Sequence, residues 1–462
     1  MTTPLVASCD TAVTKNAQHG RAIYQNKLSS PVKIVAPMVD QSELAWRILS
    51  RKYGAELCYT PMFHARLFAT SEKYRKDMWC DGLDGNPKYG DRPLIVQFCG
   101  NDPEMICKAA EFVKGKCDGI DLNLGCPQNI AKKGHYGSFL MEEWDLISKI
   151  IKKMSEKFGG TNETSNPDGF LVSCKIRVFP EYEKSLEYAK MCVDSGAQWI
   201  CIHGRLREQR GQKTGMADWD KIKYLRENLT KNKDQVVFSN GNILYPEDIK
   251  KCLEYTGCDG VMSAEGNLYN PGIFNSATNN NFDNKDKIFP RVDIILREYF
   301  EIVKKMGPES KASRNAMKSH FFKILRPFLP QHTDIRSELS KMNGNMPMED
   351  WECKIVKPIE DIVQNKIFSG SNSNSLDIIA VNKENPRYLN IPYWRCQPYF
   401  RPVNGVTGDK RLMSASIKEK KECSLKKRSH EEETEKGRDN NGTAIGENSD
   451  SAGDTKDKKL RT

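Results

Sequence analysis

The sequence lacks the paired cysteines and histidines from which structural metal sites are built. None of its fifteen cysteines belongs to a Cys-x-x-Cys pair, even Cys252 and Cys258 lie six residues apart, and the seven histidines are scattered. Zinc fingers and ribbons need closely spaced ligand pairs. We therefore expect no structural metal.

Long apolar runs are also missing. No stretch approaches the ~18 consecutive apolar residues of a membrane-spanning helix, and the first thirty residues contain no apolar core of a secretory signal. An odd number of cysteines without such a signal is typical of reduced thiols. We expect a protein without a membrane segment, located in the cytosol, the nucleus or both.

What the sequence does contain is an excess of positive charge. It has 71 Lys and Arg against 61 Asp and Glu, which gives a net charge of +10. Clustered basic side chains bind polyanions by releasing phosphate counterions. The same excess also occurs in soluble proteins with spare lysines, so charge alone leaves both interpretations open.

Short apolar runs alternate with longer amphipathic stretches along the first two thirds of the chain. These runs are apolar on successive residues, which is typical of parallel strands that are covered on both faces. Strand and helix alternating eight times favour an α/β fold of the (β/α)₈ TIM barrel type over a doubly wound sheet. The eight predicted strands lie within residues 33–38, 55–62, 93–100, 118–127, 169–178, 199–205, 235–243 and 258–266.

The rest of the chain divides by composition. An N-terminal extension (1–30) precedes the barrel (31–275), and two stretches with apolar residues at helical spacing predict a helical domain (288–345). The aromatic and proline residues of NIPYWRCQPYFRP predict an extended segment (346–404). Few apolar residues and mixed charge predict a disordered, charged tail (405–462).

The carboxyl ends of the predicted strands carry the candidate chemistry, because TIM-barrel active sites form there. A single lysine or histidine at a strand end is more often solvated or structural, but small and polar residues gather at most of these ends. They are Pro37, Met38, Gln97, Asn123, Cys126, Lys175, Arg177, His203, Arg205, Asn240 to Asn242 and Ala264 to Gly266.

The last two predicted strands indicate a phosphate site. They end in SNGN (239–242) and SAEGN (263–267), where small residues let backbone amides approach an anion. Either turn alone could be an ordinary glycine turn, but the two together favour a phosphorylated cofactor. Lys175 would place a positive charge across the same mouth, and the amide of Gln97 can both donate and accept.

Cys126 follows the fourth predicted strand between Gly125 and Pro127. A thiol with an unperturbed pKa of ~8.5 is mostly protonated at neutral pH, so it can act as a proton donor. A nucleophilic cysteine would need a histidine partner; no sequence neighbour supplies one, although folding could bring His203 near. A buried structural cysteine is the more common case, but the position at a strand end favours the proton donor. The following KKGHYGS (132–138) is predicted to form a flexible loop over the substrate.

With these residues the chain resembles the tRNA-dihydrouridine synthases, flavin enzymes that reduce uridine in tRNA. The YGSFLM and AEG sequences resemble the eukaryotic branch that acts on positions 16 and 17 of the D-loop. Bacterial members usually have Gly-Arg where Ala264 and Glu265 stand here, so backbone amides would contribute more to phosphate binding. The matching motifs are APMVD (36–40), VQFCG (96–100), DLNLGCPQ (121–128), CKIRV (174–178), IHGR (202–205), SNGNI (239–243) and MSAEG (262–266).

The resemblance implies a bound FMN and NADPH or NADH as the reductant. It also implies hydride transfer to C6 of uracil, protonation of C5 by Cys126, and uracil contacts from Asn123 and Arg177. The residues that it implies for FMN are Pro37, Met38, Val39, Gln97, Lys175, His203, Asn240, Gly241, Asn242, Ala264 and Glu265.

A tRNA substrate requires a surface that holds the RNA while one base leaves its stack. We expect it on the basic helices of the second domain, at Lys311, Arg314, Lys318, Lys323, Arg326 and Arg336, although a solvated helix face would show the same pattern. We also expect a monomer. Two alternatives remain open, which are a flavin enzyme acting on a free pyrimidine and a barrel that binds RNA without catalysis.

Overall fold

Eight parallel strands close into a barrel in the computed structural model, which describes residues 15–159, 169–229, 234–275, 284–369, 376–383 and 388–400. The strand order is β2-β1-β9-β8-β7-β6-β5-β4, and β2 also pairs with β4, which closes the circle. The predicted (β/α)₈ barrel is therefore confirmed. The strands are β1 (Lys33–Val35), β2 (Leu57–Tyr59), β4 (Leu94–Cys99), β5 (Gly119–Leu124), β6 (Leu171–Arg177), β7 (Trp199–His203), β8 (Val236–Asn240) and β9 (Gly260–Ser263).

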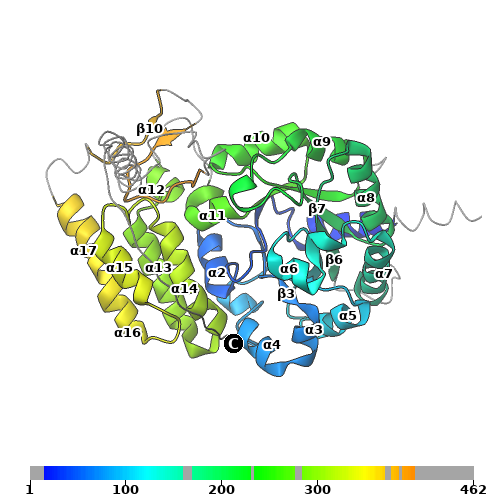
Figure 1. Cartoon of the computed structure of the whole chain (residues 1–462), viewed down its shortest axis with the longest axis horizontal. Coiled ribbons are helices and arrows are strands. Elements are labelled where there is room, and N and C mark those ends of the chain that lie inside the picture. The colour runs from blue at the N-terminus through cyan, green and yellow to red at the C-terminus, as the bar shows by residue number, and fades with distance from the viewer. Residues whose placement is uncertain are drawn as a thin grey trace, which may run out of the picture. The chain divides into compact units, whose positions relative to one another are not determined.

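Each strand is covered by helices on its outer side (Figure 1). Strands β4, β5 and β6 are buried along their whole length, as the continuous apolar runs predict. Asp102 caps α5 through its Oδ1, which accepts from the backbone N–H of Glu104 and of Met105. The surrounding helices are α2 (Leu44–Lys52), α5 (Pro103–Glu111), α7 (Trp144–Met154), α8 (Tyr182–Asp194), α9 (Trp219–Asn228), α10 (Pro246–Thr256) and α11 (Glu265–Tyr269).

One strand was not predicted. β3 (Phe63–His64) pairs with the end of β4 and leads into the short helices α3 (Ala65–Thr70) and α4 (Glu72–Met78). With only two residues it carries no periodicity from which a sequence pattern could identify it.

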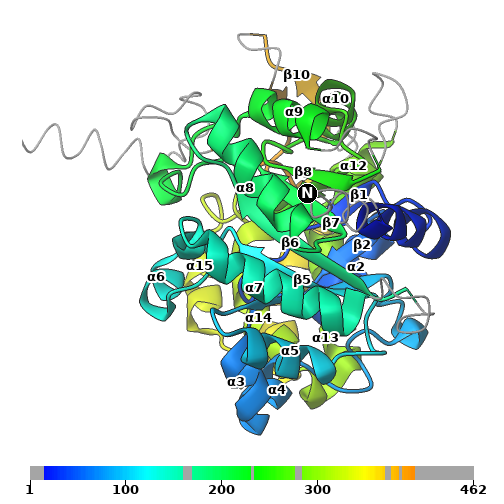
Figure 2. The same ribbon diagram turned by 90° about the vertical axis from the view of Figure 1, so that its right-hand side faces the viewer.

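The N-terminal extension covers the amino end of the barrel. Residues 15–22 are helical and continue into the π-helical turn η1 (Ile23–Lys27). Arg21 pairs with Asp259 (2.5 Å), and the Tyr24 hydroxyl donates to the backbone oxygen of Asp259 (2.9 Å). In Figure 2 this dark blue helix and α6 (Asn129–Gly134) lie at opposite ends of the strands.

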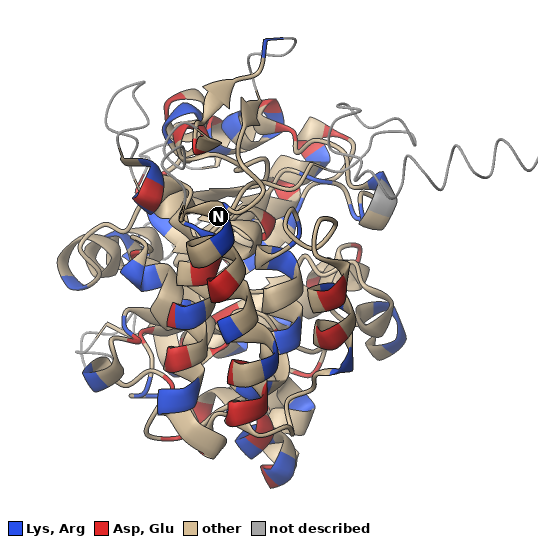
Figure 3. Cartoon of the chain, turned by 90° about the vertical axis from the view of Figure 1, so that its left-hand side faces the viewer, with Lys and Arg blue, Asp and Glu red and all other residues tan. Residues whose placement is uncertain are grey.

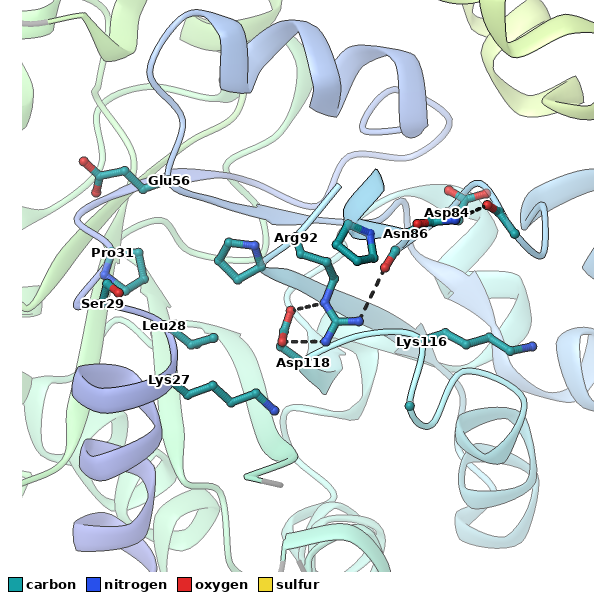
Figure 4. Close-up of a pocket in the computed structure, with 15 residues that line it drawn as sticks. Lys27, Leu28, Ser29, Pro31, Glu56, Asp84, Asn86, Arg92, Lys116 and Asp118 are labelled. Carbon is teal, nitrogen blue, oxygen red and sulfur yellow. Dashed lines mark hydrogen bonds and ion pairs between the residues drawn. The ribbon is translucent and has the colours of Figure 1, made fainter. Parts of the chain in front are cut away.

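A cavity of about 1010 Å³ also lies at the amino end of the barrel. Arg92 donates to both carboxylate oxygens of Asp118 at its wall (2.7 Å each), as Figure 4 shows. Lys27, Glu56 and Lys116 line it as well. Since the residues with candidate chemistry lie at the other ends of the strands, this cavity is not the candidate active site.

The second domain contains more helix than we predicted. The two expected helices are present as α13 (Val292–Met306) and α14 (Lys311–Ile324), and a third, α15 (Thr333–Lys341), follows them. The prediction of an extended segment over 346–404 is wrong for residues 348–367, which form α16 (Met348–Trp351), η9 (Glu352–Val356), α17 (Lys357–Asp361) and η10 (Ile362–Ile367). Trp351, Ile355, Ile359 and Val363 recur at helical spacing there and are fully buried.

The helical domain packs against the barrel through a buried polar seam. Glu43, at the start of α2, accepts from the Tyr299 hydroxyl (2.8 Å) with Oε1 and lies 3.0 Å from His320 Nε2 with Oε2. The His320 ring stacks on Trp46 with centroids 4.0 Å apart. These contacts bind α13 and α14 to the barrel helix that follows β1.

The polar stretch 369–375, whose serines, asparagines and glycine predict a flexible joint, lies outside the described residues except for Ser369. The tail predicted at 405–462 lies entirely outside them. Residues 388–400 carry β11 (Leu389–Asn390), which pairs with β10 (Ala380–Val381). No helix in the described ranges is long and apolar enough to cross a membrane.

Candidate active site

Cys126 follows β5 in a turn that a neighbouring side chain holds in place. Asn123 Oδ1 accepts from the backbone N–H groups of Gly125 (3.2 Å) and Cys126 (2.9 Å). Asn123 Nδ2 donates to Gln97 Oε1 (2.8 Å), and Gln97 Nε2 donates to Asp121 Oδ2 (2.8 Å). This chain of hydrogen bonds joins β4 to β5 and orients the turn that presents the thiol.

A second segment supports Cys126 from behind. The 3₁₀ turn η3 (Gly137–Leu140) brings the backbone N–H and the hydroxyl of Ser138 to the carbonyl of Cys126 (3.1 and 2.9 Å). Gly137 has φ +66, and a Cβ at this position would lie 2.9 Å from the same carbonyl oxygen. Only glycine therefore fits at position 137 without displacing Cys126.

The segment after Cys126 differs from the predicted loop. Residues 132–134 end the helix α6 and residues 137–138 begin η3, and Tyr136 between the two is buried. Glycines and lysines are typical of loops, but the burial of Ala131 and Tyr136 against Cys126 favours helical turns.

Cys126 is 8% exposed and lies in an apolar cluster with Cys99, Ala131 and Tyr136. Burial raises its pKa above the ordinary value for cysteine. Among the described residues no hydrogen bond joins Cys126 to His203, so the structure gives no support to a Cys–His nucleophile. The thiol is therefore protonated at neutral pH, as a proton donor requires.

Two basic side chains of β6 project toward the same mouth. Arg177 Nε donates to the carbonyl of Gly125 (2.7 Å) and Nη1 to the carbonyl of Leu206 (2.7 Å), and burial lowers its pKa to about 10. Lys175 is 8% exposed and has no hydrogen bond or ion pair within the described ranges, and burial lowers its pKa. Lys175 is thus a nearly buried ammonium group that calls for an anionic or electron-rich ligand.

His203, at the end of β7, is neutral in this site. Burial, followed by the charges of Lys175, Arg177 and Arg205, lowers its pKa well below the ordinary value. Its Nε2 lies 3.1 Å from Arg205 Nη1, and because a guanidinium can only donate, Nε2 must accept. The proton of the neutral ring is then on Nδ1.

The ends of β8 and β9 meet closely at the predicted phosphate site. Asn240 Nδ2 donates to the carbonyl of Met262 (2.7 Å), and a Cβ on Gly266 would lie 2.2 Å from the carbonyl of Ile243. Ser263 Oγ is buried and has no hydrogen-bond partner among the described residues. An unsatisfied buried hydroxyl beside close-packed glycine turns is suited to donating a hydrogen bond to a ligand oxygen.

The neighbouring loop residues have clear structural roles. Gly241 has φ +120, and its carbonyl accepts from Trp219 Nε1 (3.1 Å). Asn242 bonds the backbone of Ala217 through both its amide atoms (2.8 and 2.7 Å). Ala264 precedes α11 and Glu265 begins it.

The loop after β1 completes the mouth. The backbone N–H of Met38 donates to Ser42 Oγ (3.0 Å), while Pro37 and Val39 are partly exposed. The structure thus brings together at one end of the barrel every residue predicted for catalysis or for the cofactor.

Most of the basic residues predicted to bind tRNA already have partners. Lys311 pairs with Asp77 of α4 (2.8 Å), and Arg314 donates to the carbonyls of Gly344 (3.0 Å) and Met346 (2.8 Å). Lys318 donates to the carbonyl of Ser340 (2.5 Å), Lys323 to Ser319 Oγ (2.8 Å), and the Arg326 guanidinium lies 3.7 Å from the ring centre of Tyr399. Figure 3 shows Lys and Arg intermixed with Asp and Glu on these helices. They do not form a uniformly basic face, and of the six predicted residues Lys311, Arg326 and Arg336 are exposed.

Sequence reasoning missed the supports of Cys126. Gly137 and Ser138 hold its carbonyl, and Asp121 orients Gln97 from inside the barrel. The YGSFLM sequence identified this segment, but nothing in it showed that the turn folds back under Cys126.

Comparisons with known proteins agree with this geometry. The sequence model of the Dihydrouridine synthase (Dus) family matches residues 34–368, and within the described part no group of three or more possible metal ligands comes together. A Saccharomyces cerevisiae protein named tRNA-dihydrouridine(16/17) synthase, with NAD(P)(+) as part of its name, is 58% identical over 422 residues, covering 91% of this chain and 95% of its own length.

Two further relatives have similar names. A Schizosaccharomyces pombe tRNA-dihydrouridine(16/17) synthase is 47% identical and covers 83% of this chain and 91% of its own length. A tRNA-dihydrouridine(16/17) synthase-like protein of Mus musculus is 41% identical and covers 83% of this chain and 71% of its own length. The chain belongs to the dihydrouridine synthase family.

Proposed function

We propose that this protein reduces uridine to 5,6-dihydrouridine at positions 16 and 17 of the tRNA D-loop, with FMN as cofactor and NADPH or NADH as reductant. The names of the relatives supply the positions and the nicotinamide. The observation that carries the proposal is the Cys126 turn, which holds a protonated thiol at the barrel mouth beside Lys175 and Arg177.

The residues present fit a flavin phosphate and ring. Lys175 offers an unpaired ammonium group, Ser263 an unpaired hydroxyl, and the β8 and β9 turns a close approach to the backbone. Gln97 would face the ring with one amide hydrogen free, since Nε2 uses the other on Asp121. The loop of Pro37, Met38 and Val39 and the neutral His203 would enclose the same ligand.

The chemistry that bound FMN supplies is hydride transfer, from NADPH or NADH to C6 of uracil. Addition at C6 leaves negative charge on C5 and on the uracil carbonyls, and Cys126 donates its proton to C5 as that charge develops. The positive charges of Arg177 and Lys175 stabilise this negative charge in a site from which water is largely excluded. Asn123 keeps the thiol in place and has one amide hydrogen left for the base.

A free pyrimidine is the weaker candidate substrate. A barrel alone would enclose a small substrate, whereas here a helical domain joins the barrel through the buried Glu43–His320 contact beside the mouth. That arrangement favours a macromolecular substrate.

We also propose that the protein is a monomer located in the cytosol, the nucleus or both. The location is supported by the free thiols of the described cysteines, since thiols persist in reducing compartments.

Turnover on an unmodified tRNA transcript tests the proposal. Purified protein with FMN and NADPH should reduce the transcript far faster than an equal concentration of free uridine. Equal rates on both would contradict the tRNA assignment, and a protein that retains no flavin would contradict the whole mechanism.

A further inference from the structure

Two segments at the barrel mouth carry positive charge that the described structure leaves largely uncompensated. One is α6, with the exposed Lys132 and Lys133, and the other is the loop 204–217 after β7, with the exposed Arg210 and Lys213. We call these two segments together the α6 rim. The chain between Asn123 and Met141 contains no acidic residue.

The glutamates along or beside the α6 rim are already paired. Glu208 pairs with Arg207 (3.1 Å) and Glu143 with His135 (2.7 Å). Glu142 pairs with Lys184 on α8 (2.9 Å). Lys132, Lys133 and Lys213 therefore face solvent without a neutralising partner among the described residues.

The α6 rim is a built structure rather than two loose loops. Arg210 Nη1 donates to the carbonyl of Pro127 (2.5 Å) and to Asn129 Oδ1 (3.2 Å), so the loop after β7 bridges to the first residue of α6. Gln209 Nε2 bonds the carbonyl of Met216 (3.1 Å) and braces the loop internally. One of the two acceptors of Arg210 is thus Pro127, the residue that directly follows Cys126.

The strand order places the α6 rim across the mouth from the helical domain. α6 follows β5 and the loop follows β7, so the two flank β6, which is four strands from β1 in either direction around the barrel. α14 contacts the β1 side, where Gln41 Nε2 donates to Ser319 Oγ (2.6 Å). A ligand that spans the mouth would meet α14 on one side and the α6 rim on the other.

Two exposed apolar side chains lie on the same rim. Ile130 on α6 is 58% exposed and Met216 on the loop is 55% exposed. Apolar side chains of this kind can insert between bases that have lost a neighbour from their stack. Their presence on the same two segments as the lysines suits a nucleic acid with one base turned out.

We propose that the α6 rim is a contact surface for the RNA backbone next to the reduced uridine, and that it holds the substrate together with α14. The proposal rests on the proposed function. The partner is recognised by its phosphates, through Lys132, Lys133 and Lys213, and by its unstacked bases, through Ile130 and Met216.

The test is equilibrium binding of an unmodified tRNA transcript at several salt concentrations. The rim variant carries Lys132→Ala, Lys133→Ala and Lys213→Ala. The matched control removes the same charge from exposed lysines on the outer helices α7 and α8, through Lys149→Ala, Lys152→Ala and Lys190→Ala. We expect the rim variant to bind more weakly and to lower the slope of log Kd against log salt by about 0.7 to 0.9 for each phosphate that its side chains no longer neutralise.

Binding of the rim variant that equals that of the control would overturn the inference, while tRNA reduction by the wild type would leave the proposed function standing. Failure of the wild type to bind the transcript would overturn both. A second variant, Ile130→Ala with Met216→Ala, should keep the salt slope of the wild type and slow tRNA reduction severalfold, with flavin reduction by NADPH unchanged. Undiminished tRNA reduction by this variant would contradict the role of the apolar side chains.

Discussion

Cys126 depends on its backbone contacts more than on its side-chain neighbours. Its N–H is held by Asn123 and its carbonyl by Ser138, while Arg177 fixes the carbonyl of Gly125 just before it. The thiol itself is left in an apolar cluster that keeps it protonated. A thiol held in this way can donate its proton at one fixed point above the barrel mouth.

Replacing Cys126 with Ala should separate the two half-reactions. We expect flavin content and flavin reduction by NADPH to stay as in the wild type, because the backbone contacts of the turn survive. Reduction of tRNA should fall by ~10²–10⁴-fold, the usual contribution of a general acid. Stopped-flow absorbance of the flavin measures both steps, and tRNA reduction within severalfold of the wild type would exclude the thiol as the donor.

The pH profile of the tRNA half-reaction should reflect the raised pKa of Cys126. Since the proton donor is the neutral thiol, activity is present below its pKa and is lost as pH rises through it. The rate should therefore remain level past the ordinary cysteine pKa of ~8.5 and fall only at higher pH. Single-turnover rates between neutral and alkaline pH measure this, and a decline centred at or below that value would mean that burial does not protect the thiol.

Gly137→Ala should displace the Cys126 thiol, because the added Cβ would lie too close to the carbonyl oxygen of Cys126. Gly137 and Gly257 have nearly the same backbone angle, φ +66 and φ +65, but only at Gly137 would a Cβ meet Cys126. Both alanine variants should lose roughly 1–3 kcal/mol of stability through strain. Only Gly137→Ala should also slow tRNA reduction, and equal activity in the two folded variants would show that the contact has no role.

At the scale of the elements, the seam between α2, α13 and α14 holds the helical domain beside the mouth. Glu43, Tyr299 and His320 are buried there with matched donors and acceptors, and His320 lies flat on Trp46. Buried polar contacts of this kind fix one orientation of two packed elements, because a shifted packing would leave the groups unpaired.

Tyr299→Phe should weaken this seam. It removes one donor to Glu43 Oε1, which keeps its bond from the backbone N–H of Trp46 (3.1 Å), so we expect a loss of about 1–3 kcal/mol in the free energy of unfolding. Tyr255→Phe, at an exposed hydroxyl on α10, should change stability by less than about 0.5 kcal/mol. Urea denaturation compares the two, and equal values would show that the seam bond contributes nothing.

The helices and strands that the sequence predicts correctly are those with a clear local pattern of apolar residues. The eight barrel strands are predicted by their continuous apolar runs, and α13 and α14 by apolar residues at helical spacing. β3 is too short to show a pattern. The helices within 348–367 are indicated by the spacing of Trp351, Ile355 and Ile359, but the aromatic and proline residues that follow favour an extended segment.

At the scale of the whole molecule, the closed barrel gathers residues from distant parts of the chain. Because catalytic groups of this fold share one end, the sequence could name Asn123, Cys126, Lys175 and His203 as neighbours. It could not show that Lys318 and Lys323 are bonded within the helical domain, or that Gly137 supports Cys126. Such contacts depend on the carbonyl or hydroxyl group that the fold brings near each residue. A local sequence pattern does not contain this information.

The most direct test of the account is mass-spectrometric mapping of an unmodified tRNA transcript after incubation with the purified protein, FMN and NADPH. We predict two added hydrogens on uridines 16 and 17 of the D-loop, the positions in the relatives' names, and none with Cys126→Ala. A transcript that remains unreduced by a flavin-loaded wild-type protein, or that is reduced equally well by the Cys126 variant, would contradict it.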